Sequence, residues 1–172
     1  SYYLTMVNKG DKGEGKVFRD ENEAIMAYAS KVITLQAPIK VRRTREVNGE
    51  VRSKLVSTTA GRIIFNQPIP QDLGYVDRND PETMFNFEVD FQVTKKKLPD
   101  IISRCLAIHG TKPTSEMLDR IKAQGYKYST ISGITVAVCD AVIPPQKPEL
   151  LAEADERVSK VIKQFNRGLI SN

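Results

Sequence analysis

The sequence contains no tryptophan, one histidine and only two cysteines among its 172 residues. Two cysteines are too few for a disulfide framework, and because Cys105 and Cys139 lie in apolar stretches we expect both to be buried thiols. A structural zinc site needs four ligands, commonly in closely spaced cysteine pairs, which the sequence lacks. With one histidine, His109, and no G-x-S-x-G elbow, the sequence gives no basis for nucleophilic catalysis.

Long hydrophobic runs are absent as well. The longest apolar stretches, residues 131–138 and 141–145, fall far below the ~20 residues of a membrane-spanning helix. The first residues also lack the basic flank of a signal peptide. We therefore expect a cytoplasmic protein without a membrane partner. Because the sequence begins without a methionine or a helix cap, we also expect it to be a piece of a longer protein.

The residues that are present describe a folded domain with a basic surface. Hydrophobic residues make up 40% and charged residues 27%, which is typical of globular and not of disordered chains. The net charge is +5, and the basic excess is concentrated in residues 31–54 and 95–97. Such clusters can neutralise the phosphates of nucleic acids or nucleotides, although a net charge of this size also serves solubility.

The pattern of apolar residues predicts an α+β fold. Residues 21–31 should form a helix capped by Asp20, and residues 39–56 a hairpin around Asn48-Gly49, a dipeptide favoured in type I′ turns. Basic and apolar residues alternate along the first strand, so one face of the hairpin should be charged and solvated. Residues 73–88 are rich in turn-forming residues and are expected to be mostly loop.

The second half of the sequence is predicted to be mainly helical. One helix should begin near residue 94 and stop at Gly110, and a second should run from residue 114 to Gly125. Residues 134–138 should form a short buried strand, and a third, longer helix with an apolar stripe should span residues 149–168. The predicted fold is thus a small mixed β region with a basic hairpin, several helices and a long protruding helix at the end.

Two local patterns suggest functions of their own. Residues 10–16 match the phosphate-loop pattern G-x-x-x-x-G-K, but Val17 stands where a serine or threonine should reach magnesium, and the helix begins only after Asp20. A nucleotide hydrolase that uses this loop is one alternative hypothesis. Another is a small RNA-binding module that uses the basic hairpin, although no aromatic residues are interleaved there for base stacking.

Five stretches match segments of one known protein family in the order in which that family has them. They are residues 2–5, 12–15, 37–42, 58–66 and 125–144. The fourth contains the motif T-T-x-G-R as Thr58-Thr59-Ala60-Gly61-Arg62, and the fifth is the longest and most specific. Together they resemble the β′ subunit of bacterial multi-subunit RNA polymerases, over nearly the whole sequence.

The resemblance implies a pore domain at residues 1–145 and the start of the rim, or funnel, helices at residues 146–172. In that family these parts wall the secondary channel, which admits nucleoside triphosphates and receives the 3′ end of backtracked RNA. Transcript-cleavage and regulatory factors grip the rim. The implied protein is a fragment of a DNA-directed RNA polymerase, a nucleotidyltransferase, and its partners would be the rest of β′ and the β, α, ω and σ subunits.

The resemblance also implies which residues contact these ligands. The magnesium-binding N-A-D-F-D-G-D loop of the family lies upstream, so we expect no catalytic residue, metal ligand or cofactor in this sequence, and no activity of the isolated piece. Arg62 is the foremost candidate because a glycine suited to close backbone approach precedes it, while an internal ion pair is its alternative role. The other channel-facing candidates are Thr59, Lys40, Arg42 and Lys95. The candidates for factor docking at the rim are Arg157, Lys160, Lys163 and Arg167.

Overall fold

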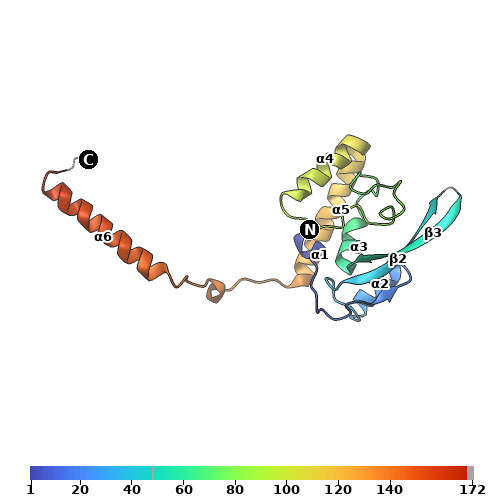
Figure 1. Ribbon diagram of the computed structural model, residues 1–172, viewed down its shortest axis with the longest axis horizontal. Coiled ribbons are helices and arrows are strands. Elements are labelled where there is room, and N and C mark those ends of the chain that lie inside the picture. Colours follow the sequence, from blue (N-terminus) through green and yellow to red (C-terminus); the bar gives the residue numbers. More distant parts are fainter. Residues whose placement is uncertain (48, 170–172) are drawn as a thin grey trace. The chain divides into compact units, whose positions relative to one another are not determined.

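The computed structural model describes residues 1–47 and 49–169. By their internal contacts the residues form two units, Ser1–Gly133 and Ile134–Asn172. The predicted α+β class is confirmed, because helices accompany a three-stranded mixed sheet and the second unit contains a long helix. Figure 1 shows the order of these elements along the chain.

The sheet is built around the predicted hairpin. Strand β1 (Val17–Phe18) pairs in parallel with β2 (Ile39–Val47), which pairs antiparallel with β3 (Glu50–Thr58). Val41 lies opposite Val56 and both are buried. The side chains that alternate with them along each strand therefore face the other side of the sheet. The predicted Asn48-Gly49 turn includes Asn48, which lies outside the described residues.

Helix α1 (Tyr2–Thr5) and helix α2 (Glu21–Ala29) precede the hairpin. The Asp20 carboxylate accepts a hydrogen bond from the Glu23 backbone N–H at 2.8 Å, which confirms the predicted cap. The helix ends two residues earlier than predicted, because Lys31 takes a left-handed conformation with φ 57°. Such a residue commonly terminates a helix.

Helix α3 (Ala60–Asn66) is the centre of the first unit, and six of its seven residues are buried. Ile63 packs with Ile39 of β2 in one core cluster. The next residues, Ile64 and Phe65, belong to a second cluster that includes Ile101 and other residues of the following helices. One short helix therefore joins two hydrophobic clusters, and Figure 1 shows it between the hairpin and α5 (Thr111–Ser132).

The segment between α3 and α4 (Lys97–His109) contains no helix or strand, in agreement with the loop predicted for residues 73–88. It is nevertheless part of the core, because Leu73, Phe87 and Val89 are almost completely buried. Packing on α3 and α4 therefore orders a segment that lacks regular backbone hydrogen bonds.

Helix α5 (Thr111–Ser132) corrects the prediction that a helix ends at Gly125. The helix continues through this glycine and ends at Gly133, which has the left-handed φ of 58° that suits a C-terminal cap. Ile121 and Tyr128, on either side of Gly125, are both buried. Their packing offsets the backbone entropy that a glycine costs in a helix interior.

The second unit contradicts two further predictions. Residues 134–138 are exposed and form no strand, and the last of them begins a short 3₁₀ turn, η1 (Val138–Asp140). No strand of the described residues pairs with this β-branched segment. A strand without a neighbour would leave its backbone N–H and C=O groups without hydrogen-bond partners. Cys139 is exposed, whereas Cys105 is buried as predicted.

Helix α6 (Lys147–Asn166) confirms the predicted long helix, and none of its residues is buried in the described chain. Its apolar stripe, which includes Leu151, Val158 and Phe165, is about half exposed. Neither α6 nor any other described helix has both the length and the apolar character needed to cross a membrane.

Candidate functional site

The T-T-x-G-R motif forms the start of α3. Thr59 is buried, and its Oγ1 accepts a hydrogen bond from the Arg62 backbone N–H at 3.1 Å. Gly61 confirms the expected close backbone approach, because a Cβ at this position would lie 2.1 Å from the Leu4 carbonyl oxygen. The Gly61 N–H also donates to the Leu35 carbonyl at 2.8 Å. The threonine and the glycine of the motif thus cap and pack the central helix.

Arg62 extends from this helix into a network within the domain. Its Nε donates to the Thr5 carbonyl at 3.1 Å, and its Nη1 donates to the Asp90 carbonyl at 2.9 Å and to the Asp90 carboxylate at 2.8 Å. Burial raises the pKa of Asp90, and the Arg62 charge opposes that rise. The ion pair given as the alternative role of Arg62 is therefore present, and a contact of Arg62 with a ligand stays a prediction.

The basic residues of the hairpin divide between its two faces. Arg43, on the inner face, forms a 2.8 Å ion pair with Glu21 and donates to the Phe85 carbonyl at 2.8 Å. Its guanidinium also lies 3.9 Å from the centre of the Phe87 ring, a cation–π contact. Burial lowers the pKa of Arg43, while Glu21 raises it. Arg43 therefore holds the hairpin against the core.

The opposite surface, here called the outer hairpin face, is exposed along its length. The register places Lys40 opposite Ser57 and Arg42 opposite Leu55. Within the described residues neither cation has an ion-pair partner. The outer hairpin face is formed by Lys40, Arg42, Thr44, Glu46, Val51, Ser53, Leu55 and Ser57.

The remaining predicted residues lie elsewhere. Lys95 is exposed just before α4, and among the described residues no side-chain hydrogen bond joins it to the outer hairpin face. On α6, Arg157 pairs with Glu153, and Lys160 lies 3.8 Å from Glu156. Lys163 and Arg167 occupy the last turn and the C-cap of α6. Lys160, Lys163 and Arg167 are three and four residues apart, a spacing that aligns them on one side of the helix.

Residues 10–16 do not resemble a phosphate-binding loop in three dimensions. The loop leads into β1 and not into a helix. The Gly15 N–H donates to the Pro38 carbonyl at 2.8 Å, and Lys12 Nζ donates to the Lys31 carbonyl at 2.8 Å. A phosphate loop instead presents free N–H groups at a helix N-terminus, so the geometry gives no support to the nucleotide hydrolase hypothesis.

Sequence reasoning missed a buried ion pair. Glu88 has a fully buried side chain and lies 2.7 Å from Arg78, which also donates to the carbonyls of Gln71, Met84 and Asn86. These groups all come from the segment between α3 and α4, where no periodic pattern marks them. Only the folded path of this segment brings them together.

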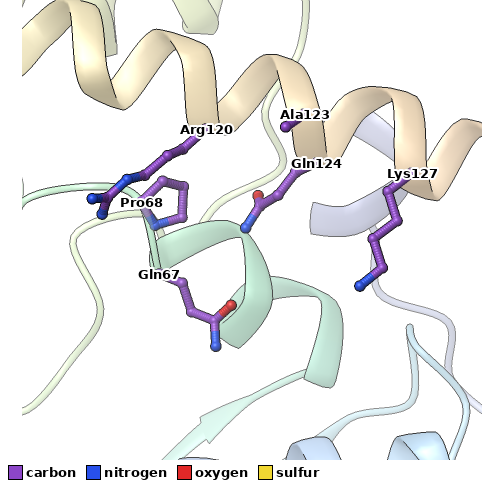
Figure 2. Close-up of a pocket in the computed structure, with 6 residues that line it drawn as sticks. All are labelled: Gln67, Pro68, Arg120, Ala123, Gln124 and Lys127. Atoms are coloured by element: carbon purple, nitrogen blue, oxygen red, sulfur yellow. The ribbon is translucent and has the colours of Figure 1, made fainter.

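A pocket of about 340 Å³ beside α5 was also missed. Figure 2 shows its walls, which come from the residues that follow α3 and from one side of α5. The two segments are about fifty residues apart in the sequence, and Gln124 Nε2 joins them by donating to the Ile64 carbonyl at 2.8 Å. Among the described residues, no group of three or more His, Cys, Asp or Glu side chains is arranged to hold a metal ion.

A capped central helix, a braced hairpin and an exposed basic face define an α+β scaffold that presents positive charge. The family described as RNA polymerase Rpb1, domain 3, matches residues 1–141. The chain therefore belongs to this family.

Curated relatives extend the similarity over the whole chain. The DNA-directed RNA polymerase subunit beta' of Clostridium perfringens (strain 13 / Type A) is 54% identical over 171 residues, which are 99% of this chain and 14% of the relative. The subunit beta' of Caldanaerobacter subterraneus subsp. tengcongensis is 55% identical over 170 residues, with coverages of 99% and 14%. That of Acetivibrio thermocellus is 50% identical over 172 residues, with coverages of 100% and 15%. The chain thus spans about one seventh of the length of these relatives.

Proposed function

We propose that this chain is a non-catalytic part of a DNA-directed RNA polymerase β′ subunit that walls the secondary channel. Residues 1–145 would form the pore domain, and residues 146–172 would begin the rim helices. The observation that carries the proposal is the outer hairpin face, where Lys40 and Arg42 are exposed without ion-pair partners in the described chain. Membership of the polymerase family supports its assignment to this enzyme.

The chemistry of the channel explains why such a face would be useful. Nucleoside triphosphates and the extruded 3′ end of RNA are polyanions. Fixed cations on a rigid wall raise their local concentration and speed their entry. Arg43 keeps the hairpin rigid through Glu21 and Phe87, so the outer cations stay in place. Nucleotidyl transfer would use magnesium-binding carboxylates elsewhere in the cytoplasmic β′β assembly with α, ω and σ.

The second part of the proposal concerns α6. Lys160, Lys163 and Arg167 on one side of an exposed helix would bind acidic surfaces of the transcript-cleavage and regulatory factors that enter the channel. Lys163 has no ion-pair partner in the described residues, and Lys160 lies a loose 3.8 Å from Glu156. Both charges are therefore accessible to a protein partner.

The channel proposal is tested in intact polymerase by Lys40→Glu combined with Arg42→Glu. A photoreactive nucleotide at the 3′ end of a backtracked RNA should crosslink to the wild-type hairpin and much less to the variant. The KM for nucleoside triphosphates should rise about two- to tenfold at low salt and less at high salt, because surface charges are screened. Unchanged crosslinking and KM would contradict the proposal. Lys112→Glu with Lys122→Glu on α5 makes the same charge change elsewhere and serves as the control.

The rim proposal is tested separately. Lys160→Glu with Lys163→Glu should weaken the binding of a transcript-cleavage factor to the intact enzyme about tenfold or more, measured by titrating cleavage of backtracked RNA. Lys160→Arg with Lys163→Arg keeps both charges and should bind normally. An equal affinity of all three enzymes would rule out this surface.

A further inference from the structure

The pocket beside α5 shares no lining residue with the outer hairpin face or with α6, and nothing in the proposed function uses it. Its volume of about 340 Å³ is at the small end of the range of ligand sites, about 300–1,000 Å³. Pro68 and Ala123 contribute apolar surface, and Figure 2 shows Arg120 and Lys127 at opposite ends. The lining residues are Gln67, Pro68, Arg120, Ala123, Gln124 and Lys127.

The two cations define the charge of a ligand. Arg120 and Lys127 are exposed, and neither has an ion-pair partner within the described residues. They are two helical turns apart, so their backbone positions are separated by about 10 Å along the axis of α5. A single small anion cannot bridge that distance. Two anionic groups at a matching separation can contact both ends of the pocket.

Gln124, between the two cations, requires a hydrogen-bond donor on the ligand. Its Nε2 is held by the Ile64 carbonyl, whereas its Oε1 is buried without any hydrogen-bond partner. A buried unpaired acceptor is costly, and a small rotation of the amide that brings Oε1 to an N–H donor would relieve that cost. Phosphate oxygens are acceptors and cannot supply such a donor. The pocket therefore favours a molecule that carries both anionic groups and N–H groups.

A peptide with two acidic residues meets these requirements. In the extended polyproline conformation, residues i and i+3 lie on the same side of the chain about 9 Å apart. Their carboxylates match the two cations, and the intervening backbone N–H groups pass Gln124. Apolar side chains between them would cover Pro68 and Ala123.

We propose that this pocket binds an acidic peptide segment of another polypeptide, with carboxylates three residues apart on Arg120 and Lys127 and a backbone N–H on Gln124 Oε1. This peptide site is separate from the proposed channel and rim roles. The peptide proposal and the channel and rim proposals can therefore fail independently of each other.

Fluorescence anisotropy with the 172-residue chain tests the proposal. The probe is dye-labelled Ala-Asp-Pro-Leu-Glu-Ala, compared with its neutral form Ala-Asn-Pro-Leu-Gln-Ala and with Ala-Asp-Glu-Pro-Leu-Ala, which has the same charge but adjacent acids. The first peptide should bind about tenfold or more tightly than either of the others, because only it forms both charge-assisted contacts. Equal binding of all three, or no binding of the first, would overturn the proposal.

Variants of the chain locate the binding. Arg120→Glu with Lys127→Glu should weaken binding of the first peptide about tenfold or more. Lys112→Glu with Lys122→Glu lies on the same helix, makes the same charge change and should alter binding less than about twofold. If both pairs weaken binding equally, the attraction is general and the pocket is not the site. Displacement of the peptide by GTP or by a short RNA at equal concentration would likewise refute a peptide site.

Discussion

Gly61 stands where three backbone segments meet. Its N–H donates to Leu35, and its missing side chain leaves room for the Leu4 carbonyl oxygen. Thr59, two residues earlier, caps the same helix with a buried hydroxyl. These contacts join α1, the segment before β2, and α3, so a single atom added here disturbs all of them.

Gly61→Ala should therefore destabilise the protein strongly. The added Cβ would lie 2.1 Å from the Leu4 oxygen and 3.1 Å from the Leu35 oxygen, and backbone atoms cannot yield as flexible side chains do. We expect the free energy of unfolding to fall by about 2–3 kcal/mol or more in urea titrations. A loss below about 0.5 kcal/mol would show that α1 can shift freely away from α3.

Single residues also show where the sequence was informative. The T-T-x-G-R motif indicated a close approach at Gly61, and that expectation is confirmed. The partners of Arg62 could not be predicted, because Thr5 and Asp90 lie 57 and 28 residues away in the chain. The burial of Cys139 was predicted wrongly, since an apolar neighbourhood in the sequence does not supply the tertiary contacts that bury a side chain.

Among the elements, α5 shows how packing overrides a local signal. Glycine usually ends helices, and Gly125 follows a well-formed amphipathic pattern. Tyr128 nevertheless belongs to the core, so extending the helix gains apolar burial that exceeds the penalty of one glycine. The left-handed cap is instead at Gly133, where the φ of 58° favours glycine.

Gly125→Ala should stabilise the protein, since Gly125 lies within α5 and, apart from its chain neighbours and the backbone of its own helix, no atom lies within 4 Å of a Cβ placed there. We expect the free energy of unfolding to rise by about 0.5–1 kcal/mol. Gly133→Ala should lower it by about 1 kcal/mol, because alanine is strained in the left-handed region. Thermal unfolding of both variants measures the difference. Destabilisation by Gly125→Ala together with stabilisation by Gly133→Ala would mean that α5 ends near Gly125.

At the scale of the whole molecule, the core belongs to one unit. All buried hydrophobic side chains of the described residues lie between Leu4 and Tyr128, whereas α6 buries none. A shortened chain that ends at Gly133 should therefore unfold with the same free energy as the full chain, within about 0.5 kcal/mol, in urea titrations monitored by tyrosine fluorescence. A larger loss would reveal stabilising contacts from the second unit.

The proposed channel and rim roles depend on the two units in different ways. The outer hairpin face is positioned by the core of Ser1–Gly133, so its cations are held rigidly. The cations of α6 belong to a helix in which no described residue is buried, and most of the stability of protein helices comes from tertiary packing of one face. We therefore expect α6 to need its polymerase surroundings for full helicity.

The sequence by itself determined the α+β class, most of the helices, the alternation of the hairpin and the order of motifs that resembles the β′ family. These features depend on local periodicity and short-range capping, which are set by residues close together in the sequence. Tertiary structure alone decided the network of Arg62, the buried pair of Arg78 and Glu88, the length of α5 and the pocket beside it. Each of these depends on contacts between distant segments, which are set by the packing of the core around α3.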